Sequence, residues 1–241
     1  WTGTGWFATG FGLAKYTTDI RAASGWTNFT NVNSAGYYLG AANDGTNTFM
    51  GIRDLTSQVQ EYGYNTSGFF GSLSYKNVNI SSNFARGTFY DPANSRYFVF
   101  GAQANIVYSS TLNFSTFYSI NAQGGSGGYG KMQYNGTYYV LDGGSGSGIV
   151  YSTNSISGYA FNGIASALGW DRIAAPNWNG TSWGTGGRYT SGSNVFAFKN
   201  NSNPSGAFTG VSKPTGFNGN RNLGTFPSKR PYYNAITNLG F

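Results

Sequence analysis

The chain has 241 residues, of which 18% are aromatic and only 9% are charged. It contains no histidine and no cysteine, so a Ser-His-Asp triad, a cysteine nucleophile, a zinc site and a disulfide framework are excluded. The net charge of +7 comes from scattered basic residues, which argues against nucleic acid as a partner, and no apolar run approaches the roughly 20 residues of a membrane span.

The predicted elements are short strands separated by polar turns, and no segment shows a helical period over three turns. The clearest stretch is Tyr134–Phe161. There the Asn135-Gly136 turn leads into the aromatic strand Tyr138–Leu141, which a segment rich in Gly and Ser then ends. Further strands begin at Ile149 and Tyr159, so this stretch predicts three strands joined by turns.

Three series of segments recur in the same order along the chain. First strands are predicted at Tyr37–Ala42, Arg86–Tyr90, Lys131–Tyr134, Arg172–Ala175 and Arg230–Ala235. Second strands begin at Trp6, Phe49, Tyr97, Tyr138 and Trp183. Third strands carry an aromatic residue followed three positions later by Asp, Asn or Thr, and these pairs are Tyr16 with Asp19, Tyr62 with Asn65, Tyr108 with Thr111, Tyr151 with Asn154 and Phe198 with Asn201.

The aromatic residues of the third series are 46, 46, 43 and 47 residues apart. Four short strands in about 45 residues is the size of a propeller blade. We therefore predict an all-β fold, a five-bladed β-propeller of four-stranded antiparallel blades, as one domain over residues 1–241. The blades are expected at 1–33 plus 230–241, 34–82, 83–123, 124–168 and 169–215, with 216–229 as a connecting segment.

The positions in the repeat at which the chain begins and ends predict that the ring of blades is closed. The chain opens on a second strand at Trp6 and ends on an additional first strand, Arg230–Phe241. The C-terminal strand is therefore expected to complete the N-terminal blade, which leaves fewer exposed sheet edges. Because residue 1 is Trp rather than Met, we also expect a processed chain or a piece of a longer protein.

At the third series the sequence resembles the Asp-box, or BNR-repeat, β-propellers, whose motif Ser-x-Asp-x-Gly-x-Thr-Trp lies between the third and fourth strands of a blade. The best match is Thr17-Thr18-Asp19 with Gly25-Trp26-Thr27, and Tyr151–Asn154 comes next. A short side chain at the box position is expected to accept backbone hydrogen bonds and pin the turn. The box positions are Asp19, Asn65, Thr111, Asn154 and Asn201. The sequence is also similar in composition to the propellers of phage tail and fibre proteins, which are rich in Asn, Gly and Ser.

The resemblance bears on catalysis, because sialidase-like members of this family use an acidic residue paired with a Tyr nucleophile, an acid/base Asp and three arginines. Here the only glutamate, Glu61, precedes Tyr62 at a third strand, on the scaffold side of a blade. We therefore predict that the chain is not an enzyme, that it has no catalytic residues, and that it needs no cofactor or metal.

Two sets of residues are predicted to bind a ligand. Sugars stack on aromatic rings, which suggests Trp170, Trp178 and Trp183 as platforms. Four of the five first strands begin with a basic residue, and only Tyr37–Ala42 lacks one. These basic residues are Arg86, Lys131, Arg172 and Arg230. First strands line the channel of a propeller, so the charges are expected to meet at its mouth and bind an acidic group.

These features predict a non-catalytic module, extracellular or on a virion surface, that recognises a cell-surface glycan or a glycosylated receptor, with an acidic ligand at the channel mouth. The alternative is a structural propeller that decorates or spaces a larger virion or cell-surface assembly and binds only protein. A sialidase-like glycoside hydrolase is the third hypothesis. A glycan array separates the first two, since the structural module is expected to give no hits.

Overall fold

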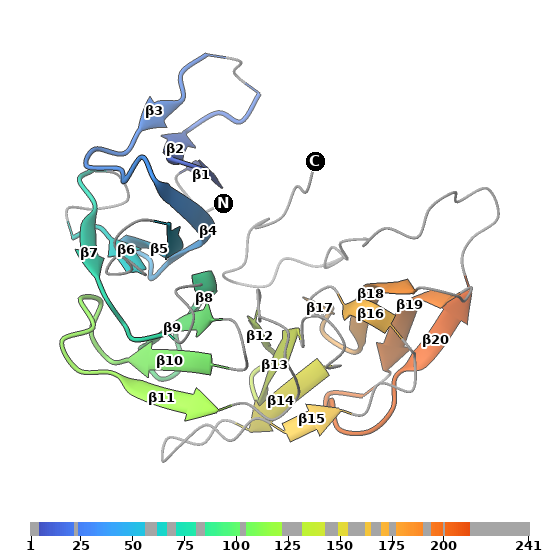
Figure 1. Cartoon of the computed structure of the whole chain (residues 1–241). Coiled ribbons are helices and arrows are strands. Elements are labelled where there is room, and N and C mark those ends of the chain that lie inside the picture. Colours follow the sequence, from blue (N-terminus) through green and yellow to red (C-terminus); the bar gives the residue numbers. More distant parts are fainter. Residues whose placement is uncertain are drawn as a thin grey trace. The chain divides into compact units, whose positions relative to one another are not determined.

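The computed structural model is all-β and consists, in the part of the chain that it describes, of strands β1 to β20 (Figure 1). The described residues are 5–21, 24–55, 62–66, 71–80, 85–101, 105–121, 132–142, 149–153, 162–164, 170–173, 177–189, 194–199 and 201–212. Within these ranges no helix is long and apolar enough to cross a membrane.

Five sheets follow one another along the chain, each built from consecutive strands. The first sheet has the order β1-β2-β3, with bounds Trp6–Gly10, Leu13–Thr17 and Thr27–Asn28. The second has the order β4-β5-β6-β7, with bounds Gly36–Asn43, Thr48–Asp54, Tyr62–Tyr64 and Ser74–Lys76. The third has the order β8-β9-β10-β11, with bounds Ala85–Asp91, Arg96–Gly101, Asn105–Ser109 and Tyr118–Asn121.

The last two sheets repeat this plan. The fourth has the order β12-β13-β14-β15, with bounds Met132–Tyr134, Tyr138–Asp142, Ile149–Thr153 and Asn162–Ile164. In the fifth, β16 (Trp170–Ile173) and β17 (Asn177–Trp178) both pair with β18 (Trp183–Tyr189), and β19 (Asn194–Lys199) and β20 (Thr209–Ser212) follow. The prediction of four-stranded antiparallel sheets is confirmed for the second, third and fourth sheets, whereas the first has three described strands and the fifth has five. The last strands of the five sheets, β3, β7, β11, β15 and β20, are short.

The chain divides into two compact units. The first holds the first three sheets, apart from residues at the ends of β10 and β11, and the second holds the fourth and fifth sheets. Each unit is described by itself below.

In the first unit the second sheet is buried on both faces, because β5 alternates its side chains between two neighbours. Met50 and Ile52 pack with Phe29, which follows the last strand of the first sheet. Phe49 instead packs with Val99 of the third sheet. This alternation has the two-residue period of a strand, so one apolar run serves two interfaces.

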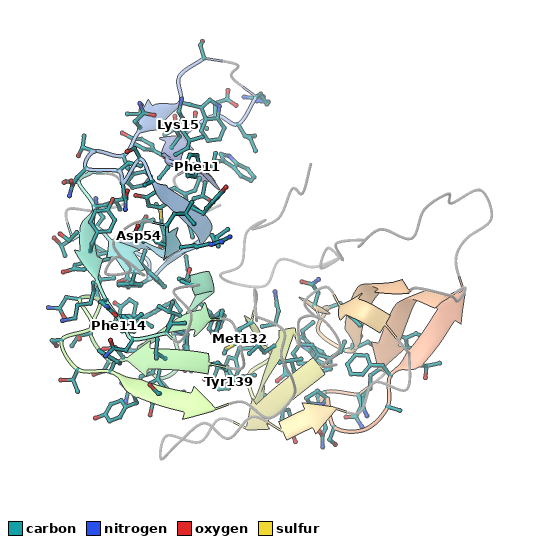
Figure 2. The ribbon with its side chains drawn as sticks, viewed as in Figure 1. Phe11, Lys15, Asp54, Phe114, Met132 and Tyr139 are labelled. Carbon is teal, nitrogen blue, oxygen red and sulfur yellow. The ribbon has the colours of Figure 1, made fainter. Side chains whose placement is uncertain are left out.

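Phe114 completes the interface between the second and third sheets (Figure 2). It lies in the turn after β10 with a φ of 48°, and its backbone N–H donates to the carbonyl of Thr111 at 3.0 Å. Its ring is fully buried against Tyr62, with 4.5 Å between the ring centroids. A turn residue thus supplies a core side chain, which a strand pattern alone does not reveal.

Two glycines allow β8 to approach β4 and β5 closely. Gly40 lies at a bulge in β4 with a φ of 76°, and a Cβ there would be 3.3 Å from the Cα of Gly87. A Cβ on Gly51 would be 3.2 Å from the Cβ of Ala85. The backbones of neighbouring sheets therefore meet where side chains would hold them apart.

The turns between the first and second strands of the second, fourth and fifth sheets share one design. Each begins with Asp or Asn, followed by Gly and Thr. The side-chain Oδ1 accepts hydrogen bonds from the backbone N–H groups two and three residues on, at 2.7 to 3.0 Å. The residues that begin these turns are Asp44, Asn135 and Asn179, and the predicted Asn135-Gly136 turn is therefore confirmed.

The second side-chain atom of Asp44 and of Asn135 reaches the next sheet. Oδ2 of Asp44 accepts a hydrogen bond from the hydroxyl of Tyr97 at 2.6 Å. Nδ2 of Asn135 donates to the carbonyl oxygen of Ser202 at 2.8 Å. A carboxylate thus meets a donor and an amide meets an acceptor, so the choice between Asp and Asn at the turn follows from the neighbouring sheet.

The box positions pin their turns as predicted in two places. Oδ1 of Asp19 accepts a hydrogen bond from the backbone N–H of Arg21 at 3.0 Å. Oδ1 of Asn201 accepts one from the backbone N–H of Asn203 at 2.9 Å. Asp19 also forms an exposed ion pair with Arg21 at 2.9 Å.

A buried hydroxyl two positions before the box position also holds the turn in two places. Ser109 accepts a hydrogen bond from the N–H of Thr111 at 3.0 Å and donates to the carbonyl of Thr116 at 2.6 Å. Thr17 likewise accepts from the N–H of Asp19 at 3.2 Å. In its described hydrogen bonds the side chain of Thr111 contacts only two hydroxyl groups, those of Ser109 and Ser115, so the expected role passes to Ser109.

Of the remaining two box positions, Asn65 differs from the expectation and Asn154 cannot be compared with it. Asn65 is fully buried, and its backbone N–H donates to the carbonyl of Thr48 at 3.0 Å. Asn154 lies outside the described residues.

The link between Asp44 and Tyr97 is sensitive to pH. Burial raises the pKa of Asp44, but the hydrogen bonds from Tyr97 and from the turn outweigh burial, so the pKa lies below its ordinary value. Because the folded pKa is lower than the unfolded one, the carboxylate stabilises the fold above the unfolded pKa of about 3.9. This contribution is lost as the pH falls through the folded pKa.

We expect Tyr97→Phe to lower the free energy of unfolding by about 1–2 kcal/mol near neutral pH, because the carboxylate loses a donor. The difference from the parent should shrink below about pH 4, and urea denaturation over a pH series measures both effects. Tyr64→Phe is the control, since the described residues provide its half-buried hydroxyl with no hydrogen bond. Equal losses in the two variants would contradict the role of the link.

Candidate functional site

Of the three predicted tryptophan platforms, one lies in the core of the second unit. Trp183 is fully buried, and its Nε1 donates to the carbonyl of Ser202 at 2.9 Å. Trp178 is half-buried with its ring 5.2 Å from that of Trp183. This burial leaves no face of Trp183 open to a ligand, which corrects the expectation for that residue. Trp170 lies on β16, and its side chain is outside the described part.

The predicted basic residues are placed only as strand positions. Arg86 is the bulge residue of β8, between Ala85 and Gly87 in the pairing with β9. Arg172 lies on β16 opposite Arg188 of β18, a second basic position that sequence reasoning missed. The side chains of Arg86 and Arg172, and all of Lys131 and Arg230, lie outside the described part. Their convergence therefore stays a prediction.

The first strand that lacks its own basic residue acquires one from the neighbouring strand. Tyr37 of β4 lies opposite Arg53 of β5 in the antiparallel register. The guanidinium carbon of Arg53 is 5.7 Å from the centroid of the Tyr37 ring, which is a cation–π distance. The start of the second sheet thus presents a ring and a cation together.

Phe11 adds a second ring to this group (Figure 2). It lies between β1 and β2, pairs with Tyr37 through an isolated antiparallel bridge, and has its ring centroid 4.7 Å from that of Tyr37. Phe11 is 56% exposed and Tyr37 is 37% exposed, so both rings reach solvent. Leu13 and Leu55, which are also exposed, follow Phe11 and the end of β5. We call Phe11, Tyr37 and Arg53 the aromatic cluster.

The position of Phe11 is fixed by the glycine that follows it. Gly12 has a φ of 58°, and its N–H donates to the carbonyl of Gly36 at 2.8 Å. A Cβ on Gly12 would lie 2.7 Å from the carbonyl oxygen of Ser34, which no side chain can occupy. Only glycine therefore lets the turn dock on β4 and hold Phe11 against Tyr37.

The aromatic cluster has the chemistry of a sugar-binding surface. Its rings offer apolar faces for a sugar, and the guanidinium of Arg53 carries N–H donors for hydroxyl, carboxylate or phosphate oxygens. Sequence reasoning missed it because Phe11 falls in a turn and Arg53 late in a strand. An aromatic residue before a turn glycine was the available signal.

The sialidase-like arrangement has no support in the described residues. Tyr62 is fully buried, and burial raises the pKa of its hydroxyl well above the ordinary value, so this phenol is a poor nucleophile. Glu61 lies outside the described residues. Within the described ranges, no group of three or more Asp or Glu side chains could hold a metal ion.

Comparison with known proteins gives a likeness of fold. No family model matches the chain, and no curated protein matches it in sequence. Among solved structures it resembles the crystal structure of a protein from Bacteroides uniformis named as a 6-phosphogluconolactonase, with a TM-score of 0.59 and 12% identity. The match covers 87% of this chain and 67% of that chain. At this identity the likeness shows the fold alone, which is propeller-like.

The likeness corrects one expectation and leaves another without support. The expectation that the chain is not an enzyme is contradicted, because the same kind of fold occurs in a protein named as an enzyme. The missing histidine and cysteine exclude particular mechanisms, but other side chains also catalyse hydrolysis. The Asp-box resemblance receives no support from the family models.

Proposed function

We propose that this protein is a propeller-type module that binds sugar chains of a cell surface or a glycosylated receptor through the aromatic cluster. The observation that carries the proposal is the exposed pair of rings, Phe11 and Tyr37, with the guanidinium of Arg53 over one of them. An exposed apolar group of this kind usually marks a binding surface. An extracellular or virion-surface location suits such a ligand.

The composition of the rest of the chain supports a sugar over a charged macromolecule. Only 9% of the residues are charged, while amide and hydroxyl side chains are abundant. Such a surface hydrogen-bonds neutral hydroxyl groups well, and the basic residues behind the net charge of +7 are scattered along the sequence rather than clustered as in proteins that bind polyanions. The alternative is a structural module that binds only protein, and the binding test below distinguishes it from a module that binds sugars.

We expect Phe11→Ala to weaken glycan binding at least tenfold, about 1.4 kcal/mol, because the stacking face is removed. Binding is measured on a glycan array of neutral and acidic sugars and by calorimetry on the hits, at low and moderate salt. Arg53→Gln should weaken acidic ligands more than neutral ones, and added salt should do the same.

Tyr118→Ala is the matched control, since Tyr118 is also 56% exposed but lies on the outer strand β11. It should leave binding unchanged, and thermal melting should show that every variant is folded. An array without hits, or equal losses in Phe11→Ala and Tyr118→Ala, would refute the aromatic cluster as the sugar site.

The proposal includes a closed ring of five blades, with residues 230–241 as the missing strand of the first sheet. The support is the burial of β1. Its five residues are all half-buried, whereas β5 and β9, which hold the same place in the repeat, are mostly buried. In the order of the first sheet, β1 stands at one end, next to β2. A further strand beside β1 would give the first sheet the four strands of its neighbours.

We expect removal of residues 230–241 to lower the melting temperature and to increase amide hydrogen exchange in β1, because the edge of that strand would lose its partner. Exchange in β9, a central strand of the third sheet, serves as the internal control and should change less. A truncated chain in which β1 exchanges at the parent rate would contradict the closure.

A hydrolase acting on a sugar lactone is the second candidate, and the likeness of fold to the protein named as a 6-phosphogluconolactonase favours it. Such a substrate is an anionic sugar derivative, which suits the same kind of surface. If the chain has this activity, it should release acid from 6-phosphogluconolactone faster than the spontaneous reaction, as measured by titration against heat-unfolded protein. A rate equal to that control would eliminate the candidate.

A further inference from the structure

The Asn-Gly turns of the second unit combine a reactive sequence with a defined geometry. Asn135 precedes Gly136, which is exposed, has a φ of 98° and carries no side chain to shield its backbone nitrogen. Space around this glycine is open, because a Cβ there would meet no atom within 4 Å. The carboxamide of Asn135 and the nitrogen of Gly136 belong to the same short turn.

The hydrogen bonds of the turn favour attack on the carboxamide carbon of Asn135. Oδ1 accepts the N–H groups of Thr137 at 3.0 Å and Tyr138 at 2.8 Å. When a nucleophile adds to Cγ, negative charge develops on Oδ1, and two backbone donors aimed at that oxygen stabilise the charge. The turn therefore provides the donors of an oxyanion hole to its own side chain.

We propose that Asn135 is a site of spontaneous deamidation that cuts one of the polar links between the fourth and fifth sheets, another being the hydrogen bond from Nε2 of Gln133 to Oδ1 of Asn177 at 3.3 Å. The deprotonated nitrogen of Gly136 attacks Cγ of Asn135, the new C–N bond forms, and the Cγ–Nδ2 bond breaks with release of ammonia. Water then opens the cyclic imide at either carbonyl, giving aspartate or isoaspartate. No oxidant, metal or enzyme takes part.

Deamidation weakens the contact between the sheets because it removes a hydrogen-bond donor, Nδ2 of Asn135. Nδ2 of Asn135 donates to the carbonyl oxygen of Ser202 at 2.8 Å, and this oxygen also accepts from Nε1 of Trp183 at 2.9 Å. After deamidation a carboxylate oxygen replaces the donor and faces the carbonyl, so an attractive contact becomes a repulsive one. At Asp44 an acid is tolerated because its partner, Tyr97, is a donor.

The chain contains its own matched control. Asn179 precedes Gly180 in the corresponding turn of the fifth sheet, and its Oδ1 accepts the N–H groups of Thr181 and Ser182 at 2.9 and 2.8 Å. Its Nδ2 makes no hydrogen bond to another sheet within the described residues. Deamidation at Asn179 should therefore leave the sheets joined as before.

The test uses the full chain, incubated at neutral and mildly alkaline pH and followed by peptide mass spectrometry. Asn135 and Asn179 should both convert to Asp and isoAsp, ahead of asparagines that do not precede glycine. Asn135→Asp should lower the melting temperature by roughly 1–6 °C, the shift that loss of one hydrogen bond produces in a chain of this size. Asn179→Asp should shift it much less.

Two results would overturn the proposal. One is an intact Asn135 after incubation that converts control peptides of the same sequence. The other is an Asn135→Asp variant whose melting temperature equals that of the parent or is no lower than that of Asn179→Asp. The turn would then be altered without any effect on the link between the sheets. Slower conversion of Asn135 in a urea-unfolded sample than in the folded chain would support the role of the turn's N–H groups.

Discussion

A small sheet of short strands cannot bury two apolar faces by itself, so stacking against neighbouring sheets is the interaction on which this structure depends. The second sheet shows it best, because Phe49 is buried toward one neighbour and Met50 and Ile52 toward the other. Each such side chain contributes roughly 1.5–3 kcal/mol by leaving water. Glycines at the closest points and large rings elsewhere then follow as geometric requirements of stacked sheets.

Polar side chains add direction to this stacking. The Asx turns hold the ends of the first hairpins, and one atom of Asp44 or Asn135 continues to the next sheet. Hydrophobic contact is tolerant of sliding, whereas a hydrogen bond between a turn and a particular partner is met in one register only. Such bonds therefore align neighbouring sheets that stacking alone would leave free to shift.

Strand content and the repeat were predictable from the sequence, because aromatic runs and Asn-Gly turns are local signals. The paired strands β12 and β13 lie where these signals predict them. The aromatic cluster was not predictable in this way. Phe11, Tyr37 and Arg53 come from a turn and two strands, and only the pairing of Tyr37 with Arg53 and the bridge to Phe11 bring them together. Trp183 was misjudged for the opposite reason, since nothing local distinguishes a ring that stacks in the core from one that faces water.

The last strands of the sheets have a consequence for how this protein behaves at high concentration. Only 9% of the residues are charged, but they leave a net charge of +7, which repels one copy of the chain from another. The last strands of the sheets, β3, β7, β11, β15 and β20, contain only two to four described residues each. An edge of that length exposes few N–H and C=O groups to a strand from another molecule. At this edge of each sheet, short strands thus add to the protection from aggregation that the net charge provides.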